Sequence, residues 1–327
     1  MTIARRAFIG GALAFGVGAC TTFEENILDP IKKIKIDPVD RLVIGSLEER
    51  LRMLEGAGDG MLGVELLNPV TGQSVSHNAD RRFGHASSFK TTLAAMVLAR
   101  GAVGTLETGK RVMWGKRDLM GHSPFTSERV AEGATLLELA RATQVTSDNA
   151  AANLLLKELG GPAAVTAFWR SIGDDVSRLD RNEPTLNNVP VTEYRDTTTP
   201  AAMARTLAAL LYGDALPDAE RAMLRQWMID TTTGLKRVRA GIRTDKGWVA
   251  GDKTGTSFWP GMGSLYVDIG FAEPPPAKEG PRAPIIFAAY FRANTTHSEV
   301  DPEVEAMFAK LGDVIRDFAI EDDGWPL

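Results

Sequence analysis

The sequence has very little of the chemistry that binds metals or forms disulfides. Among its 327 residues there are one cysteine, Cys20, and four histidines. A single cysteine cannot form a disulfide within the chain, and no pair of these residues has the spacing of zinc ligands. We therefore expect no metal centre, and a metal-dependent hydrolase is not indicated.

An excess of charge is also missing. The net charge is −5, with 44% hydrophobic and 24% charged residues. This is the composition of an ordinary globular protein, and it gives no reason to expect nucleic acid as a partner. Gly58 to Gly63 match a dinucleotide-binding glycine pattern, but they precede a predicted strand instead of following one. We expect no cofactor.

No apolar run is as long as the roughly 20 residues that a membrane helix needs. The apolar residues 7–19 follow a short basic start and suit a secretion signal better. Arg5-Arg6 resembles a twin-arginine export signal, and Val17 to Cys20 resembles a bacterial lipobox. We expect residues 1–20 to direct export to the periplasm, with lipid on Cys20 as the membrane anchor and residues 21–40 as a tether. Cleavage without lipidation stays an alternative, because Gly18 is unusual in a lipobox.

Strand patterns occur at both ends of the chain and helical patterns in the middle. The predicted helices cover residues 41–54, 136–144, 149–159, 163–172, 201–211, 219–228 and 304–318. The predicted strands cover residues 61–67, 73–77, 248–252, 265–271 and 285–291. Between two of the helices, residues 180–199 show no period, and so long a loop in a compact domain is usually functional.

This order predicts an α/β fold of the α+β type. Residues 41–84 and 231–327 would form an antiparallel sheet with flanking helices. Residues 85–230, including the 180–199 loop, would form an inserted helical domain. The cleft between the two is where a small-molecule site is expected.

Ser87 and Lys90 lie where a polar segment gives way to the apolar helical run Leu93 to Ala99. Residues three apart share one face of a helix, so the amine of Lys90 can reach the hydroxyl of Ser87. A serine at a helix start with such an amine nearby can become a nucleophile. Taken alone, the pattern favours a capped helix start followed by a surface lysine.

Three further stretches each have a plain structural interpretation. Ser147-Asp148-Asn149 opens a predicted helix and suits an N-cap. Lys253 to Thr256 ends a predicted strand, and Arg181 to Asn187 lies in the irregular loop. The order S-x-x-K, S-D-N, E-P-x-x-N and K-T-G is, however, the motif set of the class A serine β-lactamases, which the chain resembles from about residue 41 to residue 320.

The resemblance implies roles for the residues of these motifs. Ser87 is the nucleophile, and its backbone N–H forms an oxyanion hole with that of Thr256. Ser147 relays a proton to the departing nitrogen, and Glu183 activates the water that releases the acyl group. We expect burial and the nearby Lys253 to lower the pKa of Lys90. Whether Lys90 or Glu183 accepts the Ser87 proton stays open.

The resemblance also implies how substrate and loop are held. Arg181 and Asp196 close the loop with an ion pair. Arg237 aligns with a position where some members carry an arginine that supports the substrate carboxylate, although a surface arginine is an alternative. The implied substrate-binding residues are Asn149, Asn187, Lys253, Thr254, Thr256 and Arg237.

The predicted function is hydrolysis of β-lactam amides through an acyl-enzyme on Ser87, by a chain that we expect to be a monomer. Two alternatives remain at this point. A DD-peptidase would acylate the same serine, but Glu183 argues against it. A non-hydrolytic β-lactam sensor would need Ser87 without turnover.

Overall fold

The computed structural model describes residues 41–278 and 280–322, and these all belong to one compact unit, Ile34–Leu327. Cys20, together with the predicted export signal and tether, lies outside the described residues. Within the described ranges, none of the helices combines the length and the hydropathy needed to cross a bilayer.

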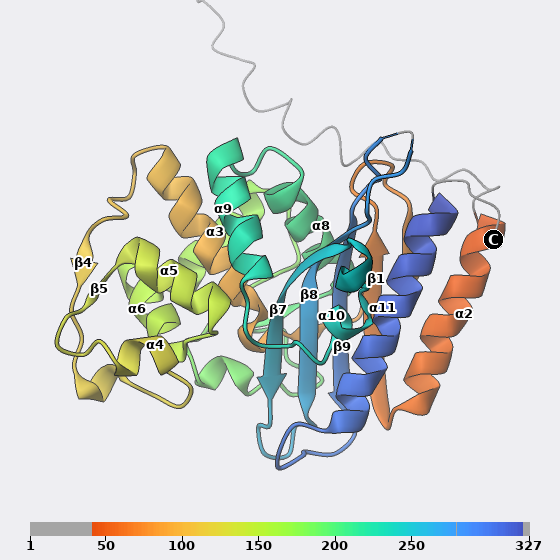
Figure 1. Ribbon diagram of the computed structural model, residues 1–327. Helices are drawn as coiled ribbons and strands as arrows, with labels where there is room; N and C mark the ends of the chain where they lie inside the picture. Colours follow the sequence, from red (N-terminus) through yellow and green to blue (C-terminus); the bar gives the residue numbers. More distant parts are fainter. Residues whose placement is uncertain (1–40, 279, 323–327) are drawn as a thin grey trace, which may run out of the picture. The chain divides into compact units, whose positions relative to one another are not determined.

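The centre of the fold is a five-stranded antiparallel sheet in the order β2-β1-β9-β8-β7. Strands from the two ends of the chain meet in it, since Val64 pairs with Ala289 (Figure 1). This arrangement confirms the predicted fold class. The strands are β1 (Gly60–Leu67), β2 (Ser74–His77), β7 (Val249–Ser257), β8 (Leu265–Glu273) and β9 (Ile285–Ala293).

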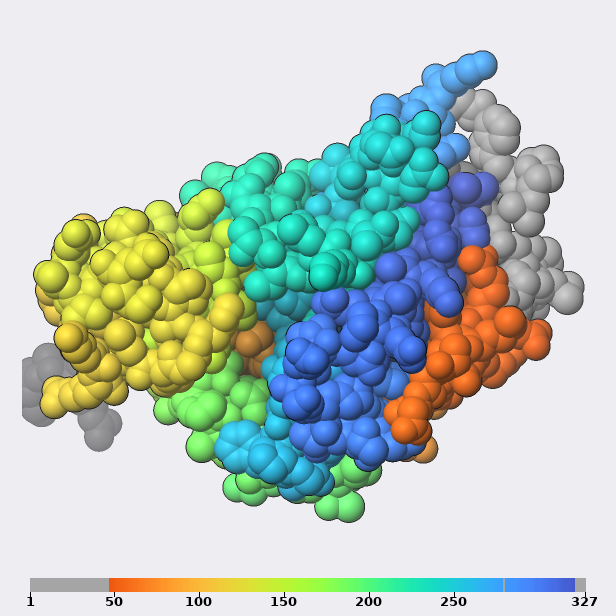
Figure 2. Space-filling view, turned by 60° about the horizontal axis from the view of Figure 1, so that its bottom comes forward, coloured from red at the N-terminus to blue at the C-terminus, as the bar shows by residue number. Residues whose placement is uncertain are grey.

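One face of the sheet is covered by α2 (Arg41–Ala57) and α11 (Pro302–Asp322), which lie side by side in both views (Figures 1 and 2). Leu51, Phe308 and Ile315 from these helices pack against Val64 and Phe287 of the sheet in one hydrophobic core. Both helices are amphipathic, in agreement with the helical spacing of apolar residues in their sequences. Their apolar sides are buried against the sheet.

The other face of the sheet packs against the helices from the middle of the chain. Helix α3 (Phe89–Ala102) is buried from Phe89 to Leu98 and is the centre of a second hydrophobic core. The remaining helices of this part are α4 (Pro124–Ser127), α5 (Leu136–Val145), α6 (Asn149–Leu159), α7 (Pro162–Ser171), α8 (Pro200–Leu211) and α9 (Asp218–Ile229).

Local sequence explains where several of these helices begin. Thr135 caps α5 in a reciprocal box with Glu138, and the side chains of Asp148 and Thr199 cap α6 and α8. Pro162 and Pro200 occupy first helical positions, where no N–H is needed.

Smaller elements complete the chain. Strand β3 (Phe83–Gly84) pairs with β6 (Thr197–Thr198), and β4 (Arg111–Val112) pairs with β5 (Ala134–Thr135). Helix α10 (Val238–Gly241) packs on α11. Short 3₁₀ turns cover Ala86–Ser88, Lys116–Asp118, Thr185–Asn187 and Thr244–Lys246. The division into domains at residues 84 and 231 stays a prediction.

Strand β7 is longer than predicted. It continues through Lys253-Thr254-Gly255-Thr256 to Ser257, whereas the sequence indicated an end at residue 252. Glycine in a strand interior weakens the strand pattern. Here Gly255 is required by close approach, because a Cβ at this position would lie 2.9 Å from the backbone nitrogen of Ser87.

Candidate active site

Ser87 is held between the start of α3 and the edge strand β7. It belongs to the 3₁₀ turn that precedes α3, and Ala86 before it has a φ of 44°. A non-glycine residue pays an energetic penalty of roughly 1–2 kcal/mol in this left-handed region, and such residues collect at functional sites. The close approach of Gly255 brings the β7 backbone against Ser87.

Lys90, the second residue of α3 and one turn after Ser87, is fully buried and lies at the centre of a polar cluster. Its Nζ donates to Ser87 Oγ at 3.0 Å and to Asn149 Oδ1 at 2.5 Å, and it lies 3.4 Å from Glu183 Oε1. It also donates to the carbonyl oxygen of Ser147 at 2.9 Å. Burial lowers the pKa of Lys90 from its ordinary value, and the Glu183 carboxylate opposes this shift.

Ser147 lies between the two buried lysines. Its Oγ accepts a hydrogen bond from Lys253 Nζ at 3.0 Å and lies 3.4 Å from Lys90 Nζ. Like Ala86, it has a left-handed backbone, with a φ of 59°. Asp148 holds this turn in place, because its buried carboxylate accepts from the N–H groups of Ala151 and Thr126.

Lys253 approaches the cluster from β7. Burial, and next to it the charge of Lys90, lowers the pKa of Lys253 well below that of an ordinary lysine. The sequence led us to expect burial and Lys253 together to depress the pKa of Lys90. In the structure burial is the main cause for Lys90, and the repulsion between the two cations acts on Lys253.

Glu183 is held from both sides. Asn187 Nδ2 donates to its Oε2 at 2.9 Å, which leaves Oε1 facing Lys90. Asn153 on α6 clamps the backbone, donating to the Glu183 carbonyl at 2.9 Å and accepting from its N–H at 3.0 Å. The Glu183–Pro184 peptide bond is cis.

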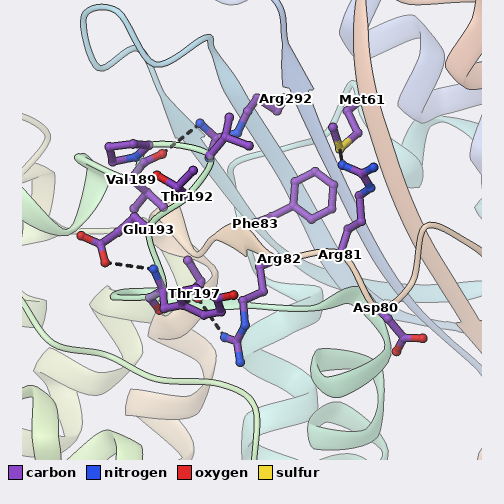
Figure 3. A pocket seen from close by; sticks show the side chains of 13 residues that line it. Met61, Asp80, Arg81, Arg82, Phe83, Val189, Thr192, Glu193, Thr197 and Arg292 are labelled. Carbon is purple, nitrogen blue, oxygen red and sulfur yellow. Dashed lines mark hydrogen bonds between the residues drawn. The ribbon is translucent and has the colours of Figure 1, made fainter.

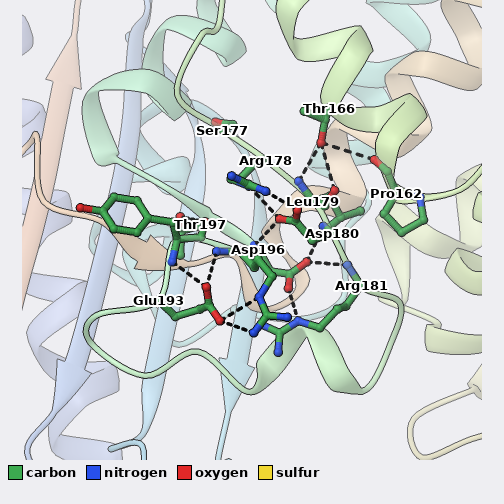
Figure 4. Close-up of polar contacts among 12 residues, drawn as sticks. Pro162, Thr166, Ser177, Arg178, Leu179, Asp180, Arg181, Glu193, Asp196 and Thr197 are labelled. Atoms are coloured by element: carbon green, nitrogen blue, oxygen red, sulfur yellow. Dashed lines mark hydrogen bonds and ion pairs between the residues drawn. The ribbon is translucent and has the colours of Figure 1, made fainter.

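The 180–199 segment, which we call the Ω-loop, is closed at its base by Asp196 (Figure 4). Its carboxylate binds Arg181 Nε at 2.5 Å and accepts from the N–H groups of Asp180 at 2.7 Å and Arg181 at 2.9 Å. The carbonyl of Asp196 accepts from the N–H of His85, two residues before Ser87. The ion pair implied by the resemblance is therefore present, and it also ties the loop to the nucleophile.

Arg237 is buried, with 3% of its surface exposed, which excludes the surface position that the sequence left open. Its Nη2 donates to Thr256 Oγ1 at 2.6 Å, and Nη1 donates to the carbonyls of Gly255 and Val267. Burial lowers its pKa. Arg237 is thus placed directly behind the hydroxyl predicted to meet the substrate carboxylate. Thr254 Oγ1 donates to Thr233 Oγ1 at 2.7 Å.

Two supporting residues were missed by the sequence analysis. Asn153 follows Asn149 by four residues and therefore shares its face of α6, a spacing that could have found it. Gln144 is buried between α3 and β7, accepting from Thr91 Oγ1 at 2.8 Å and donating to the carbonyl of Asp252 at 2.9 Å. Nothing in its local sequence distinguishes it from other helical glutamines.

The structure thus brings the four motifs into one place. Ser87, Lys90, Ser147, Asn149, Glu183 and Lys253 are linked by contacts of 3.4 Å or less. Within the described ranges, no group of three or more His, Cys, Asp or Glu residues could hold a metal ion. The cluster offers a hydroxyl next to a buried amine, with a carboxylate on the amine's other side.

Comparison with known proteins agrees with this geometry. Residues 46–319 match the model of the β-lactamase enzyme family. β-Lactamase FAR-1 from Nocardia farcinica is 46% identical over 62% of this chain and 64% of its own length. β-Lactamase L2 from Stenotrophomonas maltophilia is 41% identical, covering 80% of this chain and 82% of that one.

A solved structure of an ancestral class A β-lactamase is 45% identical, with a TM-score of 0.76 over 83% of this chain and 99% of that chain. The resemblance seen in the motifs is confirmed, and the chain belongs to the β-lactamase enzyme family, as a class A serine β-lactamase.

Proposed function

We propose that this protein opens the amide of penicillins and cephalosporins through an acyl-enzyme on Ser87 and then hydrolyses that intermediate. The observation that carries the proposal is the position of Lys90 Nζ, 3.0 Å from Ser87 Oγ and 3.4 Å from Glu183 Oε1. The buried amine of Lys90 thus contacts both the nucleophile, Ser87, and the carboxylate proposed to activate water, Glu183. Family membership supports the same reaction.

In acylation, Ser87 Oγ attacks the lactam carbonyl carbon, the ring C–N bond breaks, and the ring nitrogen receives a proton. The direct contact with Ser87 Oγ supports Lys90 as the group that takes its proton, and burial favours the neutral amine that this step requires. Ser147 Oγ, which touches both lysines, is suited to pass a proton to the nitrogen.

In deacylation, a water attacks the ester carbonyl and releases Ser87 together with the opened product. Glu183 accepts the proton of this water, while Asn187 and Asn153 hold the carboxylate and its backbone in position. A positioned general base of this kind contributes roughly 10²–10⁴-fold to the rate.

Substrate recognition would use the groups along β7. Thr256 and Thr254 offer hydroxyls and Lys253 a cation to the substrate carboxylate, with Arg237 behind Thr256. The N–H groups of Ser87 and Thr256 would bind the developing oxyanion. Removing one such donor typically costs about 2.7–4 kcal/mol of transition-state stabilisation.

A chromogenic cephalosporin tests the proposal when colour and protein mass are followed together. The wild-type enzyme should turn over many equivalents without stable labelling. Glu183→Gln should accumulate acyl-enzyme, and Ser87→Ala should do neither. Stoichiometric labelling of the wild type without turnover would instead indicate the non-hydrolytic sensor.

We further propose that the protein acts as a monomer exported to the periplasm and anchored by lipid on Cys20. The lipobox-like Val17 to Cys20 supports the anchor, and a site built from one chain supports the monomer. Analytical ultracentrifugation of the solubilised protein tests whether it is a monomer. The lipid anchor is tested by Cys20→Ser, which should move activity from the membrane fraction to the soluble fraction. Unchanged fractionation would contradict lipidation.

A further inference from the structure

A cavity of about 520 Å³ lies beside residues 189–194 of the Ω-loop (Figure 3). Residues from β1, β3 and β9 form one wall, and residues 189–194 of the loop form the other. None of the proposed catalytic residues lines it. Its apolar surface comes from Met61, Phe83, Val189 and Val191, and its volume lies in the range of roughly 300–1,000 Å³ typical of small-molecule sites.

Arg292, from β9, is the unusual member of this cavity. Its side chain is buried, with 9% of the residue exposed, yet the described residues offer it no carboxylate partner. Its Nη1 donates to the carbonyls of Val189 at 3.0 Å and Met262 at 2.8 Å. Burial lowers the pKa of Arg292, and no acidic side chain offsets the shift.

The other charges around the cavity leave this cation uncompensated. Arg81 and Arg82 also line it, and neither forms an ion pair within the described part of the chain. Arg82 is instead bonded to the carbonyl of Val176 and the hydroxyl of Thr197. Of the two acidic lining residues, Glu193 is already held by Arg195 at 2.5 Å. The remaining acid, Asp80, forms no ion pair with these arginines in the described part of the chain, and its side chain points away from Arg292 (Figure 3).

We propose that this cavity binds a small organic anion, with a carboxylate paired to Arg292 and an apolar body packed against Phe83 and Val189. A guanidinium binds a carboxylate in two parallel hydrogen bonds, and a buried cation gains most from such a partner. Because Arg292 already holds the Val189 carbonyl, two residues beyond Asn187, the bound anion restrains the loop that carries Glu183.

Benzoate and its neutral analogue benzamide are suitable probes, read by methyl resonances of the full-length protein labelled at valine. Benzoate should shift the Val189 and Val191 signals saturably, and benzamide should bind at least tenfold more weakly. Shifts confined to residues around Lys253 would overturn the proposal, because the anion would then occupy only the active site. Equal binding of the two probes would also overturn it.

A matched pair of variants locates the site without disturbing the core. Val191 is 72% exposed on the cavity wall, and Val70 is 69% exposed on the β1–β2 turn. Val191→Asp should weaken benzoate binding about tenfold by supplying a competing carboxylate, while Val70→Asp should bind as the wild type does. Arg292→Gln, checked for folding by circular dichroism, should abolish binding. Undiminished binding by Val191→Asp and folded Arg292→Gln would contradict the assignment.

Discussion

Two buried ionisable residues at and beside β7, Lys90 and Asp252, have an opposite charge close by, whereas two on β1 and β9, strands that pair with each other, have none among the described residues. Lys90 has Glu183 at 3.4 Å, and Asp252 has Arg239 at 2.8 Å. Glu65 on β1 and Arg292 on β9 are also buried, but the described residues form no ion pair with either. The fold therefore tolerates a buried ionisable side chain without an opposite charge beside it, whereas the catalytic cluster places opposite charges close together.

Lys90→Met is the change expected to have the largest effect, because it breaks the compensated side of this comparison. It removes the amine beside Ser87 and leaves Glu183 buried without its cation. Acylation should slow by roughly 10²–10⁴-fold, measured as the rate at which a cephalosporin labels the protein.

The double variant Lys90→Met/Glu183→Gln separates the two roles of Lys90. It should unfold at higher urea concentration than Lys90→Met alone, since the uncompensated carboxylate is gone. Acylation should remain slow in both. If the double variant were the less stable of the two, Glu183 would not depend on Lys90 for its charge.

Glu65→Gln tests the uncompensated side through pH. Burial raises the pKa of Glu65 from 4.5 to about 7, while Ser74 and Arg205 oppose the shift. Between these values the folded protein holds a proton that the unfolded chain has released, so the free energy of unfolding falls as pH rises through about 7. The variant lacks this loss and should be more stable at pH 8 by on the order of 3 kcal/mol.

Urea denaturation of wild type and Glu65→Gln between pH 4.5 and pH 8.5 measures this difference. The two proteins should have similar stability at the acidic end and diverge toward the alkaline end. A constant difference across the range would show that Glu65 does not change its protonation state there.

Asp196→Asn should have a smaller effect, confined mostly to the Ω-loop. The asparagine oxygen can still accept from the N–H groups of Asp180 and Arg181, but the negative charge that binds the Arg181 side chain is lost. We expect a stability loss of about 1–3 kcal/mol and slower deacylation, because the loop positions Glu183. Single-turnover mass spectrometry should show deacylation falling more than acylation. Equal losses in both steps would mean that Asp196 acts through His85 and the nucleophile instead.

The catalytic motifs could be predicted from sequence because their chemistry is carried by residue type and local spacing. Ser87 and Lys90 share a helix face, and Asp148 caps the helix next to Ser147. Contacts between distant segments left no comparable trace. The close approach of Gly255 to Ser87 could not be predicted, because it depends on tertiary packing.

The same limit applies to Gln144 and Arg292. Gln144 forms hydrogen bonds with both α3 and β7. Arg292 lines a cavity whose opposite wall is formed by the Ω-loop. Each lies in an ordinary helix or strand pattern, and its role arises only from what the fold places opposite. In particular, the sequence does not show whether a buried charged side chain will have an opposite charge next to it, because the partner comes from a distant segment.

Lys110→Gln should have the smallest effect and sharpens the comparison by separating pairing from burial. Lys110 Nζ lies 2.5 Å from Glu158 Oε2, a shorter contact than that between Lys90 and Glu183, but 52% of the lysine side chain is exposed. Water and salt already solvate such a pair, so we expect a loss below about 1 kcal/mol in urea denaturation. The loss of stability should be smaller still in 1 M salt, because the Debye length there is only about 3 Å and the attraction between exposed charges is screened. If Lys110→Gln instead cost as much as Asp196→Asn, distance would matter more than burial. The contrast between the β7 cluster and the β1–β9 strands would then have to be explained by geometry instead of desolvation.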